Sequence, residues 1–321
     1  MSVALSADRL RPWLLASRPK TLVAAVAPVV VGSALAFNAR AFALWPALAA
    51  LCGAVLIQVG TNLTNDVLDF RRGADTAARL GPTRVTQAGL LSPRAVAIGA
   101  AVAFALAVAV GAYLVAVAGW PIALLGVLAI ASGVAYTAGP APLAYVGLGD
   151  VFVMAFFGVA AVGGTYFAEV MAALDGPART AALARLPLAL VLGVGVGALA
   201  TAILTVNNLR DLPTDTAAGK RTLAVRLGDG ATRRYLDALL FTAFAAPMAM
   251  VAFGAVGAAA AAVLLSVPFA LPPGRSVAGG IRGAALNPVL GQVARLQVAY
   301  ALCLAAGLVA DRLLRSWVAG G

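Results

Sequence analysis

Residues 42–69 read FALWPALAALCGAVLIQVGTNLTNDVLD, an apolar stretch that ends in Asn and Asp residues. Its uncharged part is about 20 residues or more, which is enough for a helix to cross roughly 30 Å of hydrocarbon. The apolar residues do not alternate with polar ones, so a helix is favoured over a barrel strand. The acidic residues are therefore expected where this helix leaves a membrane.

The same pattern recurs along the whole chain. Of its 321 residues, 62% are hydrophobic and 11% are charged, whereas an ordinary soluble domain is about 25% charged. We expect nine spans, at 21–38, 42–62, 94–117, 121–138, 147–168, 186–206, 236–253, 255–271 and 294–314. The predicted fold class is an all-α integral membrane protein, a bundle of about nine transmembrane helices. Residues 1–321 are expected to form one membrane domain.

The charge distribution indicates membrane topology. The net charge is +11, and with the N-terminus inside, nine spans place all but five of the 23 Lys and Arg residues on one side. Positive residues gather on the cytoplasmic side of membrane proteins. This distribution argues against nucleic-acid binding. It also places the loops 62–93 and 207–235 in the cytoplasm, and predicts a multi-pass protein of the cell membrane.

Acidic residues are rare in this chain, and they cluster. There are only 12, and five of them lie in two short segments. The first is NLTNDVLD at 62–69, continuing to Asp75; the second is NNLRDLPTD at 207–215, continuing to Lys220. Ionisable groups in or beside a membrane are functional by default. Two matched clusters therefore predict a site.

The available ligands predict a hard metal ion. The chain has no histidine, and Cys52 and Cys303 lie in apolar spans without a CxxC motif, which excludes His-dependent catalysis and argues against a zinc site. The remaining oxygen ligands suit Mg²⁺. Spacings of three and four residues place each pair of carboxylates on one face of a helix. A divalent cation would remove their mutual repulsion.

The clusters therefore predict a diphosphate held by bridging Mg²⁺ ions, two being expected. Nearby basic residues could neutralise the rest of its charge: Arg72, Arg79, Arg84, Lys220 and Arg226. A diphosphate at a membrane face suits a lipid headgroup. Metal binding stabilises diphosphate as a leaving group, and an apolar cavity protects an allylic cation from water. An electron-rich aromatic acceptor could then attack that cation.

At this point the motifs resemble a known family. Asn65-Asp-Val-Leu-Asp69 with Asp211-xxx-Asp215-xxx-Gly219 is similar to the UbiA superfamily of intramembrane aromatic prenyltransferases. Further segments resemble its 1,4-dihydroxy-2-naphthoate polyprenyltransferase subfamily, namely Arg18-Pro-Lys-Thr21, Gly73-x-Asp75, Arg79-x-Gly81-Pro82-x-Arg84, Tyr136-Thr-x-Gly139-Pro140, Gly147-Leu-Gly149 and the run from Asn207 to Ala224.

The resemblance implies nine helices around a central cavity, Mg²⁺ and a polyprenyl diphosphate donor. It implies prenylation of 1,4-dihydroxy-2-naphthoate with loss of CO₂, giving demethylmenaquinol or demethylmenaquinone in menaquinone biosynthesis. Together with the spacing argument, it assigns metal binding to Asn65, Asp66, Asp69, Asp75, Asn207, Asp211 and Asp215. Four of these are expected to be catalytic: Asp66, Asp69, Asp211 and Asp215. The acceptor and cavity residues are expected to be Lys20, Asn62, Tyr136 and Asn208.

Three positions depart from the superfamily pattern. Gly73 replaces a third Asp, and Asp75 follows two residues later, a shift that the naphthoate subfamily shares. Val67 replaces an aromatic residue, and Asp150 replaces a Glu. The acceptor could also be 4-hydroxybenzoate or homogentisate. The alternatives of another class are a non-catalytic lipid-diphosphate transporter and a phosphatidyltransferase, although the latter carries its acids in one continuous motif. The motifs do not encode the prenyl chain length.

Overall fold

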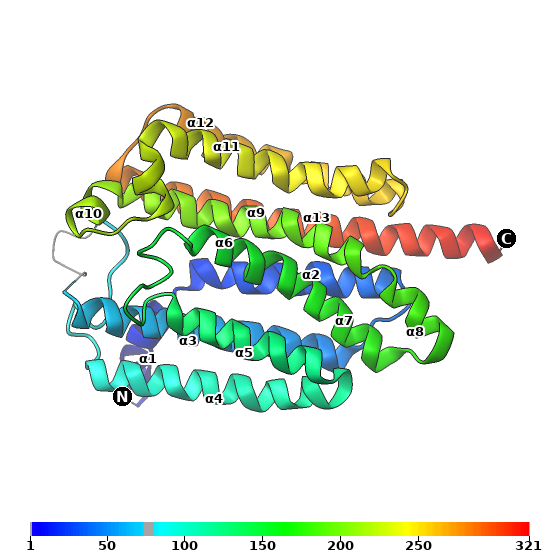
Figure 1. Cartoon of the computed structure of the whole chain (residues 1–321), viewed down its shortest axis with the longest axis horizontal. Helices are drawn as coiled ribbons and strands as arrows, with labels where there is room; N and C mark the ends of the chain where they lie inside the picture. The colour runs from blue at the N-terminus through cyan, green and yellow to red at the C-terminus, as the bar shows by residue number, and fades with distance from the viewer. Residues whose placement is uncertain (1, 74–79, 321) are drawn as a thin grey trace.

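The computed structural model describes residues 2–73 and 80–320, and the side chains of 10–73 and 80–318. Over this part of the chain every regular element is helical. The long helices lie side by side along the length of the molecule (Figure 1). The predicted all-α fold class is confirmed.

Eight helical segments within the described residues are long and apolar enough to cross a membrane. They are α2 (Pro19–Asn38), α3 (Leu44–Arg71), α4 (Pro93–Ala118), α6 (Gly149–Met154) with η1 (Ala155–Ala160) and α7 (Ala161–Ala173), α8 (Gly176–Leu183) with α9 (Leu186–Arg210), α11 (Leu223–Ala252), η2 (Ala258–Ser266) with α12 (Val267–Ala278), and η3 (Gly283–Leu286) with α13 (Asn287–Gly320). A shorter apolar helix is α5 (Trp120–Ala135). The remaining helices are α1 (Ser2–Ser17) and α10 (Leu212–Ala217). Each of the nine predicted spans overlaps a different apolar segment.

Two segments that were expected to be loops are largely helical. Residues 207–235 contain the end of α9, all of α10 and the first turns of α11, which bends at Gly228 (φ 76°). In residues 272–293, which separate the last two predicted spans, α12 continues through Pro272 and Pro273, and α13 begins at Asn287. Membrane helices tolerate proline where their neighbours satisfy the freed backbone groups.

The bundle core is centred on α9, where Val196, Leu199 and Ala202 are fully buried. Helix association in lipid depends on close van der Waals packing, because lipid tails are as apolar as the helices. Gly158 of η1 packs directly against α9, and a Cβ added there would lie 2.4 Å from the carbonyl oxygen of Gly193. This close contact fixes the position of η1.

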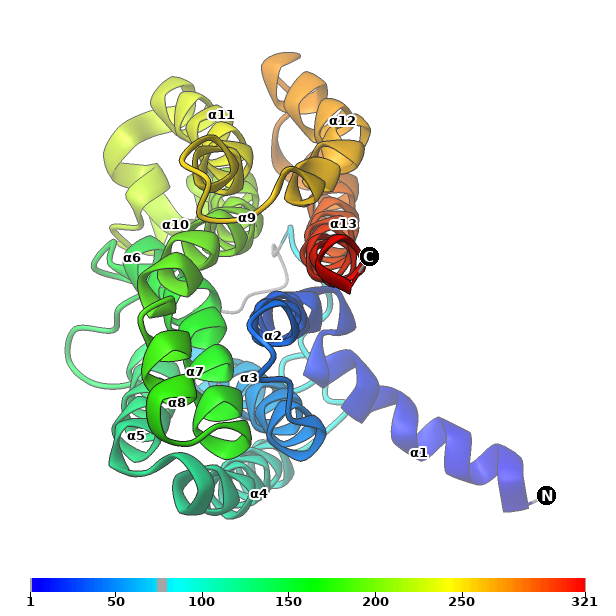
Figure 2. The same ribbon diagram turned by 90° about the vertical axis from the view of Figure 1, so that its right-hand side faces the viewer.

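By contrast, α5 contains no buried residue. The end-on view shows α4 and α5 at the edge of the bundle, and α1 pointing away from it (Figure 2). One face of α5 lines a cavity, as described below. This helix is therefore a wall of the site and contributes little to the core.

A polar network lies at the end of α2 farther from the acidic clusters; we call Asn38, Arg185, Asp311 and Arg315 the far-end clasp. Asn38 Nδ2 donates to the Leu308 carbonyl (2.8 Å) and to Asp311 Oδ2 (3.1 Å). Arg185 donates to Asn38 Oδ1 (2.8 Å), and Arg315 pairs with Asp311 (3.1 Å). The far-end clasp ties α2 and the start of α9 to α13.

Candidate functional site

A cavity of about 940 Å³ runs through the bundle between α2, α3, α4, α5, α7 and α9. The two acidic clusters, which lie far apart in the sequence, meet at one end of it. Their residues in its lining are Asn62, Asn65, Asp69, Asn207, Asn208, Asp211, Asp215 and Lys220. The clusters meet because α3 and α9 both end there. We call this the polar end of the cavity.

Asp69 belongs to the last turns of α3 and lines the cavity. Its Oδ2 accepts a hydrogen bond from Arg84 Nη2 (2.8 Å), and its Oδ1 accepts one from the Tyr145 hydroxyl (2.9 Å). Both partners come from segments between helices. This largely buried carboxylate is therefore held between a cation and a hydroxyl donor.

Asp66 is only 2% exposed and is not part of the cavity lining. Its oxygens accept hydrogen bonds from the backbone N–H groups of Val85 (3.2 Å) and Thr86 (3.1 Å). Residues three apart on a helix differ by about 60° in direction, so Asp66 points to the connecting segment and Asp69 to the cavity. Asp66 therefore anchors the segment that carries Arg84 to α3.

The second cluster spans a break between helices. Asp211 caps the end of α9 and Asp215 belongs to α10, so the predicted face of one continuous helix is wrong. The break still leaves them one turn apart, since Asp215 N–H donates to the Asp211 carbonyl (2.7 Å). Arg210, fully buried, holds Asp211 with two hydrogen bonds of 2.8 and 2.5 Å. Its third donor binds Asn287 of α13 (3.0 Å).

Tyr145 connects the two clusters, a role that the sequence did not reveal. Its hydroxyl binds Asp69, and the ammonium of Lys220 lies over its ring, 4.9 Å from the centroid. Lys220 in turn pairs with Asp215 (3.3 Å). Burial, followed by the charge of Asp69, raises the pKa of Tyr145 above its usual value. The hydroxyl therefore remains a hydrogen-bond donor at neutral pH.

The structure places all four predicted acceptor and cavity residues in the lining: Lys20, Asn62, Tyr136 and Asn208. Asn62 donates to the Ser17 carbonyl (2.9 Å) and so holds the junction of α1 and α2 against α3. At that junction Arg18, which was not predicted as a site residue, adopts a left-handed backbone (φ 53°) and lines the cavity. Such backbone conformations in residues other than glycine are uncommon and cluster at functional sites.

Other predicted residues are not in the lining. Arg72 donates to the carbonyls of Thr137 and Gly139, and Arg226 donates to that of Val146 (2.8 Å). Both arginines therefore hold the segment between α5 and α6 and do not face the cavity. Arg84 and Lys220 do line the cavity, whereas Asp75 and Arg79 lie outside the described residues.

Aromatic side chains form part of the cavity wall. Phe152, Phe156 and Phe157 line it, and the first two rings are stacked, with centroids 6.1 Å apart. The turn at Ala155–Ala160 is π-helical, a local widening that is rare and often found at functional sites. No sequence signal marked this turn. It helps to direct two adjacent phenylalanines into the same cavity.

The donor set at the polar end fits a hard cation. Asp69, Asp211 and Asp215 supply carboxylates, and Asn65 and Asn207 supply amide oxygens. In the described part of the chain, no group of three or more His, Cys, Asp or Glu side chains is close enough to hold an ion alone. An ion there would take one or two protein carboxylates and complete its shell with phosphate oxygens and water, which is how Mg²⁺ typically binds.

Comparison with known proteins agrees with this geometry. The model of the UbiA prenyltransferase family matches residues 25–274. The chain is 38% identical to the 1,4-dihydroxy-2-naphthoate octaprenyltransferase of Mycobacterium leprae (strain TN), and the match covers 92% of this chain and 95% of that protein. It is also 38% identical to the 1,4-dihydroxy-2-naphthoate octaprenyltransferase of Mycobacterium tuberculosis (strain ATCC 25618 / H37Rv), over 94% of this chain and 98% of that protein. The structure of a UbiA homolog from Archaeoglobus fulgidus bound to GPP and Mg²⁺ aligns with a TM-score of 0.59 at 18% identity, over 93% of this chain and 99% of that one.

Proposed function

This chain belongs to the UbiA prenyltransferase family, and we propose that it transfers a polyprenyl group from a polyprenyl diphosphate to 1,4-dihydroxy-2-naphthoate, releasing diphosphate and CO₂. The observation that carries the proposal is the meeting of both acidic clusters at one end of an otherwise largely apolar cavity. The naphthoate acceptor is supported by the named activity of relatives that match over most of the chain. The product would be demethylmenaquinol, an intermediate of menaquinone biosynthesis.

Asp69, Asp211 and Asp215, helped by Asn65 and Asn207, would hold Mg²⁺, one ion at each cluster. The oxygen donors support this role, as does the Mg²⁺ bound together with GPP in the Archaeoglobus fulgidus homolog. When bound, Mg²⁺ would neutralise the charge that develops on the departing diphosphate.

Arg84 and Lys220 would contact the phosphate oxygens, since both line the cavity beside the carboxylates. Asp66 would act through Arg84, because it anchors the backbone at Val85 and Thr86. Arg72 and Arg226 would have structural roles only. Arg18 and Lys20 offer the positive charge that the carboxylate of the naphthoate needs.

The reaction balances without an oxidant or a reductant. The bond between the allylic carbon and the diphosphate oxygen breaks, and diphosphate leaves with the electron pair. The ring carbon that bears the carboxylate forms the new carbon–carbon bond, and the carboxylate leaves from it as CO₂, returning its bonding electrons to the ring so that no ring proton is lost. Phe152, Phe156 and Phe157 would keep water away from the cation and present aromatic faces to it.

We also propose that residues 1–321 form one domain in the cell membrane, with the polar end of the cavity facing the cytoplasm. The excess of Lys and Arg on that side of the predicted spans supports this orientation. A cytoplasmic polar end would receive a water-soluble acceptor from the cytoplasm and a lipid donor from the membrane.

The deciding experiment incubates the purified protein in detergent with Mg²⁺, a polyprenyl diphosphate and 1,4-dihydroxy-2-naphthoate. Prenylated product and diphosphate are expected, and chelation of Mg²⁺ should stop their formation reversibly. Product with 4-hydroxybenzoate or homogentisate but not with the naphthoate would contradict the acceptor assignment. Binding of the donor without turnover on any aromatic acceptor would favour a transporter.

A further inference from the structure

The cavity follows α3 along most of its length. Its lining residues on that helix recur on one face from Asp69 to Ala50, a distance of about 28 Å at the helical rise per residue. From Ile57 towards the start of α3, the side chains on this face are apolar and, after Ile57, small: Ala54, Gly53 and Ala50. A donor whose diphosphate is held at Asp69 would therefore extend its prenyl chain towards Ala50.

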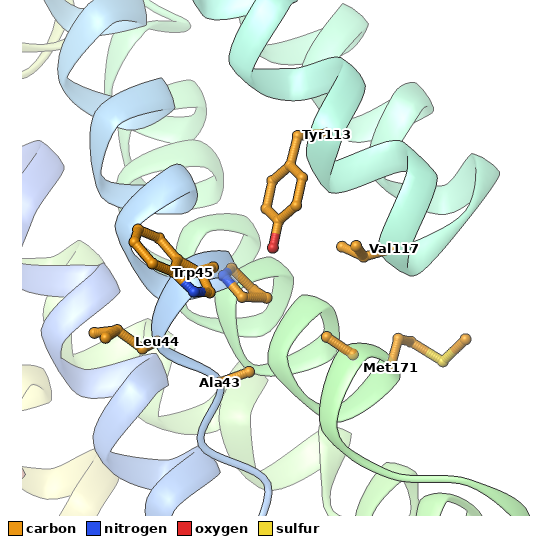
Figure 3. A pocket seen from close by; sticks show the side chains of 8 residues that line it. Ala43, Leu44, Trp45, Tyr113, Val117 and Met171 are labelled. Carbon is orange, nitrogen blue, oxygen red and sulfur yellow. The ribbon is translucent and has the colours of Figure 1, made fainter.

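A second hollow of about 440 Å³ begins where this cavity ends. Ala50 on α3, Leu114 on α4 and Ala168 on α7 line the deep end of the cavity. About one turn farther along the same three helices, Pro46, Val117 and Met171 line the second hollow. Figure 3 shows Tyr113, Val117, Met171 and Trp45 bordering it. The two spaces therefore lie in series along one groove.

A thin partition separates them. It consists of the buried residues Leu114, Ala118 and Ala168, and the partly buried neighbours packed against them include Ala49, Val117, Ile122, Phe167 and Met171. Leu114 is the one large side chain among those three. Methionine is unbranched and adapts its shape easily, so a modest rearrangement of Leu114 and Met171 would join the two spaces.

We propose that the second hollow receives the distal isoprene units of a long donor, and that the partition at Leu114 governs which prenyl lengths are accepted. This inference rests on the proposed function for the identity of the donor. The occupant follows from continuity, because the chain is already held in the cavity by its diphosphate and the hollow is the space directly beyond it. Surrounding lipid is as apolar as the hollow, so blocking the hollow should act by steric exclusion of the distal isoprene units and not by loss of apolar contact.

The test blocks the partition and compares donors of two lengths. Leu114→Trp should lower kcat/KM for a long donor such as octaprenyl diphosphate by about tenfold or more, since overpacking at this point is costly. With farnesyl diphosphate, kcat/KM should change by no more than about twofold. Ala168→Leu narrows the same point from α7 and should act alike. Leu106→Trp is the matched control, because Leu106 is 51% exposed on α4 and lies outside the lining.

A graded variant sharpens the test. A Cβ at Gly111 meets no atom within 4 Å, so Gly111→Leu has space to fill about one turn closer to the diphosphate. It should shift the length limit to donors shorter than those that Leu114→Trp excludes. Equal losses for short and long donors in all three variants would overturn the proposal, as would unchanged use of the long donor.

Failure of the proposed function is distinguishable from failure of this inference. If the unmodified protein does not prenylate the naphthoate with either donor, the proposed function fails. The binding constants of the two diphosphates, measured without an acceptor, then replace turnover as the readout. Leu114→Trp should weaken binding of octaprenyl diphosphate about tenfold or more and leave farnesyl diphosphate unchanged; equal binding by both proteins would contradict the subsite.

Discussion

The two ends of the bundle carry similar charged groups but differ in what these groups face. At the polar end of the cavity, Asp69 and Asp211 pair with arginines. In the far-end clasp, Asp311 pairs with Arg315 and is just as well buried. The former carboxylates line a large cavity, whereas no residue of the far-end clasp does. A buried acid–arginine pair in a membrane bundle is therefore not sufficient to identify a site.

The partners also differ in kind. In the far-end clasp, Asn38 binds Asp311, Arg185 and the Leu308 carbonyl, so these polar groups bind one another and the backbone. At the polar end, Arg84 and Lys220 come from connecting segments and lie beside open space. Groups of both signs beside a cavity can exchange partners with an anionic ligand and its metal. The comparison predicts loss of activity at one end and loss of stability at the other.

The largest effect is expected at Asp211. Asp211→Asn keeps the size of the side chain and an acceptor for Arg210 but removes the negative charge available to a metal ion. We expect kcat/KM to fall on the order of a thousandfold, measured at a temperature below unfolding. The thermal midpoint in detergent should fall as well, because one N–H of the buried Arg210 then faces an amide N–H. Prenyl transfer and thermal unfolding of the same preparation measure both quantities. Near-normal turnover would remove this carboxylate from the metal site.

Asp66 should show a smaller effect of a different kind. Asp66→Asn can accept from only one of the Val85 and Thr86 N–H groups, because the other would meet an amide N–H. Loosening this anchor should displace Arg84, so we expect KM for the donor to rise about 10- to 100-fold, with a smaller change in kcat. If kcat instead falls as far as in Asp211→Asn at unchanged donor KM, Asp66 is a metal ligand after all.

The contrast between Asp66 and Asp69 shows how far the sequence reaches. Uninterrupted apolar runs were enough to predict the spans, because lipid leaves a helix few alternatives. The scarcity of acids was enough to select the two clusters. The spacing could not say which Asp faces the cavity, because a 60° difference in direction matters only once the connecting segment at Val85 is placed against α3.

The arginines were harder still. Arg72 and Arg84 flank the same stretch of sequence, yet Arg72 binds backbone carbonyls and Arg84 binds Asp69. A guanidinium satisfies either kind of acceptor, so only the tertiary structure decides between them. Tyr145 went unnoticed for the same reason: its link between the clusters depends on two contacts that are distant in sequence.

A smaller effect is expected from Tyr145→Phe. The substitution removes the hydroxyl that donates to Asp69 but retains the ring beneath Lys220. We expect turnover to fall by only about two- to tenfold, the net value of an ordinary hydrogen bond (about 0.5–1.5 kcal/mol), because Asp69 keeps its pairing with Arg84. Because burial and Asp69 raise the pKa of Tyr145, the hydroxyl stays protonated through its ordinary range. The pH profile of the variant should therefore match that of the unmodified protein up to about pH 10; an alkaline limb that disappears with the substitution would contradict this.

The smallest effect on turnover is expected at the far-end clasp. Asp311→Asn removes the ion pair with Arg315. One of the N–H donors of Asn38 and Arg315 then lacks an acceptor, which costs about 1–3 kcal/mol of stability. The thermal midpoint should fall, while prenyl transfer at a temperature below unfolding stays within about twofold. Leu313→Ala, at a position 55% exposed on the same helix, controls for a general weakening of α13. A loss of activity in Asp311→Asn as large as that in Asp211→Asn, without unfolding, would mean that the two ends are functionally coupled, and the distinction between them would fail.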